Sequence, residues 1–137
     1  MGLYLCIFED DEDIGGVDVG AYSDFGRFRD TVGERLEAKL AGSRFPTLML
    51  HSDCDGQWTC EECKLLIAEL DSIAAEFKGI PPVAFPAGWQ QSVADRENLV
   101  PKSLYDCFID VDGEHLIERI RWLCTLAIES QLPISFQ

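Results

Sequence analysis

The feature that most constrains the fold is an amphipathic helix with a clear start signal. Thr59 and Glu62 have the spacing of a capping box, in which the hydroxyl and the carboxylate each accept a hydrogen bond from an otherwise unpaired amide. Apolar residues then recur every three or four positions before a stop near Gly79, and they are Cys63, Leu66, Ile67, Leu70, Ile73, Ala74 and Phe77. Such a face is stable only when another layer covers it, so the rest of the chain must supply that layer.

Two more segments have helical periodicity. A cap at Ser23 or Asp24 opens a predicted helix that ends at Gly42. Its apolar face comprises Phe25, Phe28, Val32, Leu36 and Leu40. Asp112 and Gly113 open a third main helix, whose inward face comprises Leu116, Ile117, Ile120, Leu123, Cys124, Ala127 and Ile128. A short additional helix is predicted over residues 89–97.

The covering layer is predicted to be a small sheet. Residues 3–8 form an apolar run of strand-forming residues, and residues 17–22 alternate and pair with them as a hairpin across an acidic turn. Residues 47–51 and 132–137 are predicted as two further strands, whereas residues 104–109 fit either a strand or a short helix. The sequence therefore predicts one α/β (α+β) domain over residues 1–137, with a mixed sheet of about four strands packed against three main helices.

The charge balance limits the possible partners. The chain has 137 residues, and its 11 Lys and Arg against 25 Asp and Glu give a formal charge of −14. Phosphate groups repel such a surface, so neither nucleic acid nor an anionic membrane is an expected partner. The expected partner is a basic molecule. No basic segment precedes the apolar start of the chain and no apolar run reaches about 18 residues, so we expect a cytoplasmic protein.

One segment holds a concentration of reactive side chains. His51 and Cys54, followed by Cys60 and Cys63, would give an imidazole and three thiolates, which is a possible tetrahedral zinc set, although the two pairs are unusually close together. Cys60 and Cys63 also form a CxxC at a helix start, but the intervening Glu61 and Glu62 disfavour a thiolate. A zinc- or thiol-based regulatory domain is therefore an alternative hypothesis, and ordinary structural roles for all four residues are the simpler one.

No catalytic motif accompanies these residues. The two histidines lie outside any recognisable nucleophile context, and the sequence has no glycine-rich phosphate loop. The sequence therefore favours a protein that is not an enzyme and that needs no cofactor.

Two groups of residues are candidates for binding a partner. The first is the acidic turn after the first strand, made of Glu9, Asp10, Asp11, Glu12 and Asp13, which would place a negative tip on a rigid hairpin. Its simpler interpretation is a solubilising turn.

The second group is the loop that contains Asp53, Asp55 and Trp58. Trp58 lies between charged residues and is expected to be an exposed aromatic of the kind that anchors interfaces, unless it packs as a core lid over the following helix.

Several segments resemble one family of bacterial immunity proteins. They are residues 1–8 (MGLYLCIF), residues 43–58 (SRFPT running into HSDCDGQW), residues 104–113 (LYDCFIDVDG) and residues 133–137 (PISFQ). The resemblance extends over nearly the whole chain and is to immunity protein 70. It concerns the fold, because none of these segments is a catalytic motif.

The resemblance implies a function that the residues alone do not give. Immunity proteins protect a toxin-producing bacterium by binding its own toxin, usually over the active site or an adjacent exosite. The expectation is a cytoplasmic, non-enzymatic inhibitor of a cognate toxin, and a basic toxin such as a nuclease would suit an acidic chain. Within this expectation, the acidic turn and then Asp53, Asp55 and Trp58 are the predicted toxin-binding residues.

Overall fold

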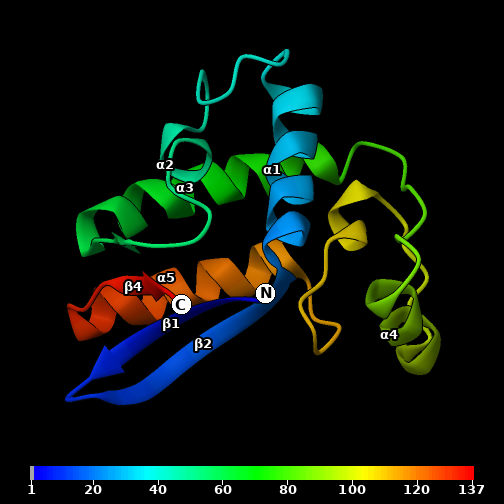
Figure 1. Ribbon diagram of the computed structural model, residues 1–137. Coiled ribbons are helices and arrows are strands. Elements are labelled where there is room, and N and C mark those ends of the chain that lie inside the picture. Colours follow the sequence, from blue (N-terminus) through cyan, green and yellow to red (C-terminus); the bar gives the residue numbers. More distant parts are fainter. Residues whose placement is uncertain (1) are drawn as a thin grey trace.

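The fold is described by a computed structural model that covers residues 2–137, so Met1 lies outside the described residues. Four strands, five α-helices and a short 3-10 helix follow one another along the chain (Figure 1). In order they are β1 (Gly2–Glu9), β2 (Glu12–Ala21), α1 (Tyr22–Leu36), α2 (Pro46–Met49), β3 (Gln57–Trp58), α3 (Cys60–Phe77), α4 (Trp89–Glu97), η1 (Leu104–Cys107), α5 (Leu116–Ser130) and β4 (Ile134–Phe136).

The strands form one sheet in the order β2-β1-β4-β3. All three strand pairs are antiparallel, so the sheet is antiparallel rather than mixed. The end of the chain pairs with its start, because Leu5 lies opposite Phe136 and Cys6 opposite Ser135. The predicted α/β class, with four strands and three main helices, is confirmed.

Helices α1, α3 and α5 cover one face of this sheet and enclose a single core against it, whereas α4 lies to one side (Figure 1). Strand alternation points Leu3, Leu5 and Ile7 into that core, where all three are fully buried. On the other face of β1, Cys6 is buried, Tyr4 is half-buried and Phe8 is exposed. The sheet therefore has one covered face and one open face, as is common for antiparallel sheets.

The expected third strand over residues 47–51 is wrong, because Pro46–Met49 is the short helix α2. Its start is stabilised by Glu69 of α3, whose carboxylate accepts the amides of Thr47 and Leu48 at 3.1 and 3.0 Å. Its end is stabilised by Arg29 of α1, whose guanidinium donates to the carbonyl of His51 at 2.6 Å. An acid at the N-terminus and a base at the C-terminus suit the helix dipole, and both come from distant parts of the sequence.

The first long helix is shorter than predicted. It ends at Leu36 instead of Gly42, and Leu40 is 66% exposed although its spacing fits the apolar stripe. Ala38 and Lys39 adopt positive φ angles of 50° and 66°, which end the helix there. At the other end, the N-cap is Ala21 instead of the predicted Ser23 or Asp24. Asp24 is the third residue of the helix, and its carboxylate accepts the amide of Ala21 at 2.7 Å.

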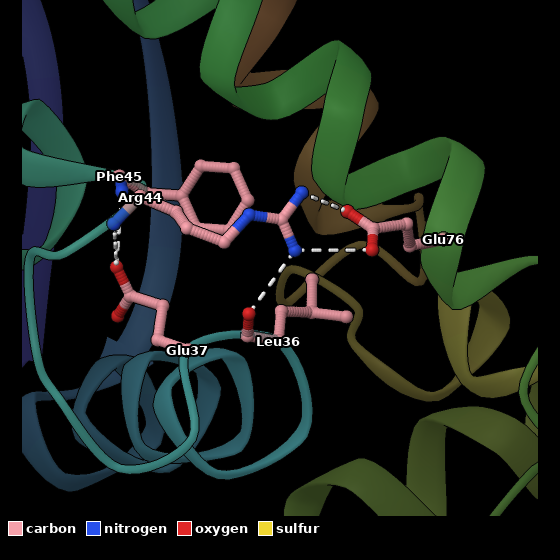
Figure 2. A network of polar contacts seen from close by, with 5 residues as sticks. All are labelled: Leu36, Glu37, Arg44, Phe45 and Glu76. Atoms are coloured by element: carbon pink, nitrogen blue, oxygen red, sulfur yellow. Dashed lines mark hydrogen bonds and ion pairs between the residues drawn. The ribbon is translucent and has the colours of Figure 1, made fainter.

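The segment after α1 is held by the buried carboxylate of Glu37, which is only 3% exposed. Its oxygens accept the backbone amides of Gly42, Arg44 and Phe45 at 3.2, 2.9 and 2.9 Å. The neighbouring Arg44 pairs with Glu76 of α3 through two hydrogen bonds of 3.0 and 2.6 Å (Figure 2). The segment thus fastens the end of α1 to α3.

The remaining predictions hold in outline. The capping box is present, because Thr59 accepts the amide of Glu62 and the Glu62 carboxylate accepts the amide of Thr59. Residues 104–109 resolve into η1 and a single β-bridge between Ile109 and His115. The third main helix begins at Leu116, three residues after the predicted start at Gly113.

Glu37→Gln is expected to lower the free energy of unfolding by about 2 kcal/mol, because the amide group of glutamine would point an N–H at backbone N–H donors in a buried site. Urea denaturation followed by circular dichroism measures the loss. Glu34→Gln, an exposed position on α1, is the matched control and should change stability by less than about 0.5 kcal/mol. Equal losses in the two variants would contradict the anchoring role of Glu37.

Candidate protein-interaction surface

The acidic turn is the tip of the β1–β2 hairpin. Glu9 pairs with Glu12, and Asp10 and Asp11 form the two-residue turn between them with φ angles of 51° and 66°. Two positive φ angles are the pattern of a type I′ turn, which Asp tolerates and which matches the twist of the strands. The hairpin holds these residues, here called the hairpin tip (Glu9, Asp10, Asp11, Glu12 and Asp13), at its far end (Figure 1).

Few groups of the protein neutralise the negative charge of the hairpin tip. All five side chains are exposed, and no ion pair found within residues 2–137 involves them. Asp13 differs from the others because its carboxylate accepts the Tyr4 hydroxyl at 2.6 Å and the Gly15 amide at 3.0 Å. The tip is therefore a compact group of carboxylates on a well-defined backbone.

Aromatic surface adjoins these charges on the open face of the sheet. Phe8 pairs with Asp13 across the strands and is 39% exposed. Tyr4 lies on the same face of β1, four residues before Phe8, and is opposite the exposed Asp18. An aromatic group next to carboxylates offers a partner both apolar contact and charge.

The Tyr4–Asp13 hydrogen bond also changes the acidity of the phenol. The bond, followed by desolvation and by the negative charge of Asp13, raises the pKa of Tyr4 to about 12. The ring lies directly over Gly16, where any side chain would collide with the phenol oxygen. Gly16 thus permits the position of the ring, and Asp13 fixes it.

The loop that contains Asp53 and Asp55 lies elsewhere. Both side chains are exposed, but the loop enters β3, which is separated from β1 by β4. Its last residue, Gly56, accepts the amide of Phe136, which lies opposite Leu5 in the middle of β1, whereas the hairpin tip lies at the end of β1. The structure therefore does not bring the two predicted acidic groups together.

The expectation that Trp58 is exposed is wrong. Its side chain is fully buried, and its indole N–H donates to the carbonyl of Thr47 at 3.1 Å. The ring packs edge-on against Phe136, with centroids 4.8 Å apart. Trp58 is a core residue because β3 directs it inward, so it cannot anchor a partner on this surface.

The alternative zinc set does not assemble. The His51 ring stacks on Phe136, and its two nitrogens contact the carbonyls of Ser52 and Gln57 at 2.8 and 2.9 Å. Cys54 is exposed, whereas Cys60 donates to the carbonyls of Ala127 and Leu132. Within residues 2–137, no group of three or more His, Cys, Asp or Glu side chains is arranged to hold a metal ion.

A thiol-based site on Cys60 and Cys63 is not supported either. Cys63 is buried and contacts Cys124 of α5 instead of Cys60. The hydrogen bond with Cys63, followed by burial, raises the pKa of the Cys124 thiol. These thiols contribute to α3–α5 packing, as the simpler interpretation of the cysteines expected.

The prediction from sequence missed two exposed aromatic residues, Phe8 and Trp122. Phe8 ends the predicted strand over residues 3–8, and its position next to the acidic turn is the signal that it is exposed. Trp122, 42% exposed on α5, lies outside the apolar stripe of its helix, which a helical wheel would reveal.

Comparison with known proteins gives one match. The family described as Immunity protein 70 matches residues 3–136. No curated protein and no solved structure matches the chain. Among the described helices, none combines the length and the apolar character that crossing a membrane requires.

Tyr4 is expected to ionise at about pH 12, and Asp13→Asn should return its pKa toward the ordinary value of 10.0, because a neutral amide accepts less strongly and carries no charge. The folded protein holds the neutral phenol more tightly than the unfolded chain does, so this contribution to stability is complete below pH 10 and is lost between about pH 10 and 12. Tyrosinate absorbance measures the titration.

Tyr4→Phe identifies the transition that belongs to this residue, and Asp18→Asn is the control, because Asp18 makes the smallest of the contributions to the shift. An Asp13→Asn titration identical to that of the original protein would contradict the assigned cause.

Proposed function

Because the chain belongs to the immunity protein 70 family, we propose that it binds and neutralises a cognate bacterial toxin through an acidic surface centred on the hairpin tip. The toxin is a basic protein, and a nuclease is the class that fits best, since an enzyme that acts on nucleic acid must itself attract phosphates. The protein acts in the cytoplasm by occupying the toxin, without a chemical step of its own.

The observation that carries this proposal is the exposed, unpaired charge at the end of a rigid hairpin. Five acidic residues in succession, Glu9 to Asp13, stand at the tip, and the chain as a whole has a formal charge of −14. Charges arranged in this way steer a cationic partner during diffusion and can raise association rates roughly 10- to 1000-fold at low salt. The I′ turn fixes the backbone that carries these carboxylates, so little backbone conformational entropy is lost on binding.

The tip alone is too small for a tight complex. A stable interface buries about 800 Å² on each partner. The exposed ring of Phe8 and the open face around Tyr4 and Asp18 extend the acidic surface from the tip along the sheet. The tip therefore supplies the first encounter, and neighbouring surface completes the interface.

Replacing Asp10 and Asp11 by Asn is expected to slow association with the toxin about tenfold at low salt, because Asn keeps the positive φ angles but removes two charges from the tip. The probe is the toxin domain encoded beside this chain's own gene, produced with an inactivated active site, and surface plasmon resonance measures the rate. The difference should shrink as salt rises from about 0.05 to about 0.5 M, where the Debye length falls below the width of the tip.

The matched control removes two acids from α1, by Asp30→Asn with Glu34→Gln, and should leave the association rate within about twofold of the original. An association rate that does not depend on salt would refute steering. A toxin domain that does not bind the original protein at all would refute the function itself.

A further inference from the structure

The flank of α5 exposes an aromatic side chain beside the edge strand β2. Trp122 is 42% exposed, and its indole lies against the backbone of β2 at Gly15, where a Cβ atom would come within 3.3 Å of the ring. The Arg119 guanidinium stands 4.4 Å from the ring centroid. A Cβ atom at Gly15 would also come within 2.6 Å of Leu126, so the glycine permits the close packing of α5 on β2, and part of the indole remains available to a partner.

A hollow of about 520 Å³ adjoins the indole. It is lined by Asp112, Glu114, Glu118, Arg119 and Trp122. A second hollow of about 350 Å³ shares Asp112, Glu114 and Glu118 with it, so the two hollows adjoin. We call the two hollows together with the indole the α5 groove.

The wall of the α5 groove is fixed by a buried carboxylate. Asp110, 1% exposed, accepts the amides of Asp112 and Glu114, each at 3.0 Å, and the Arg119 Nε–H at 3.3 Å. The other end of the Arg119 guanidinium donates to the carbonyl of Gly16 at 3.2 Å. The groove is thus built before any partner arrives.

The charge of the α5 groove determines what it can hold. Arg119 is committed to Asp110, to the Gly16 carbonyl and to the indole, so it does not neutralise the exposed Asp112, Glu114 and Glu118. The nearest other basic group to Glu118 is His115, 4.0 Å away. A second copy of this chain would bring 14 more negative charges, and nucleic acid would bring phosphates, so both are repelled.

We propose that the α5 groove is the anchoring site for a lysine- or arginine-bearing segment of the toxin, with the Trp122 indole as its central contact. A cationic side chain lies on the open part of the indole and pairs with Glu118 and Glu114, a combination of cation–π and charge-assisted contacts that is strong when desolvated. This inference rests on the proposed function and adds to it a second site. Residues 13–16 of β2 connect the hairpin tip to the α5 groove. In this proposal the tip steers the toxin and the groove retains it.

The test uses the inactivated toxin domain encoded beside this chain's gene and measures both rate constants. Trp122→Ala should weaken the complex about 30-fold, mainly through faster dissociation, as removal of an interface hot spot does. Trp122→Phe should lose less, and Glu118→Gln should lose about fivefold while changing the association rate little. Leu65→Ala is the matched control, because Leu65 is 60% exposed on α3 and lies outside the groove.

Hydroxyl-radical footprinting gives a second readout, since oxidation of Trp122 should fall when the toxin domain is bound. The footprint of the original protein, compared with and without the toxin domain, tests the groove without any mutation. Urea denaturation confirms that each variant is folded.

The outcomes separate the two proposals. If the toxin domain binds but Trp122→Ala behaves like Leu65→Ala and the indole stays equally oxidisable, the groove is refuted and the proposed function stands. If the original protein does not bind the toxin domain, the proposed function is refuted, and this inference with it. Protection of Trp122 that depends on the concentration of the chain alone would identify a second copy as the occupant and overturn the inference.

Discussion

Two buried carboxylates determine how the loops of this protein are held. Taking an ionised carboxylate out of water costs several kcal/mol unless hydrogen bonds replace the lost water. Glu37 and Asp110 meet this requirement with backbone amides from their own following segments. The consequence is that residues 37–45 and 110–114 have little freedom, although neither segment belongs to a helix or strand. Asp110 thereby gives the α5 groove a fixed wall, and Glu37 holds the segment that fastens α1 to α3.

The parts of the fold that could be predicted are those that depend on local periodicity. The helices around Leu66 and Ile120, and the strand pair that flanks the acidic turn, bury residues spaced as their own geometry requires. The strand predicted over residues 47–51 is wrong, because an apolar run of that length fits either a strand or a helix. Hydrogen bonds with Glu69 and Arg29 stabilise the helix, and no local sequence pattern predicts these contacts with distant residues.

The candidate sites show the same division. The hairpin tip is visible in the sequence because its charges and its turn are consecutive. The α5 groove is not, since it requires Arg119 to reach the carbonyl of Gly16, 103 residues earlier in the chain. Two adjacent glycines allow close packing here: Gly15 makes room for Leu126 and Trp122 of α5 on the covered face, and Gly16 makes room for Tyr4 on the open face. Their roles become apparent only when β2 and α5 are side by side.

The proposed division between steering and anchoring agrees with where these groups are placed. Charges in water act over about 10 Å and are screened by salt, so exposed carboxylates at a projecting tip influence mainly the rate of encounter. An aromatic ring beside a hollow loses water when it is covered, so it influences mainly how long a complex lasts. The Asp110–Arg119 pair keeps the second region rigid, and the type I′ turn does so for the first. Since both regions lie along β2, one partner can use them in succession without any change in the fold.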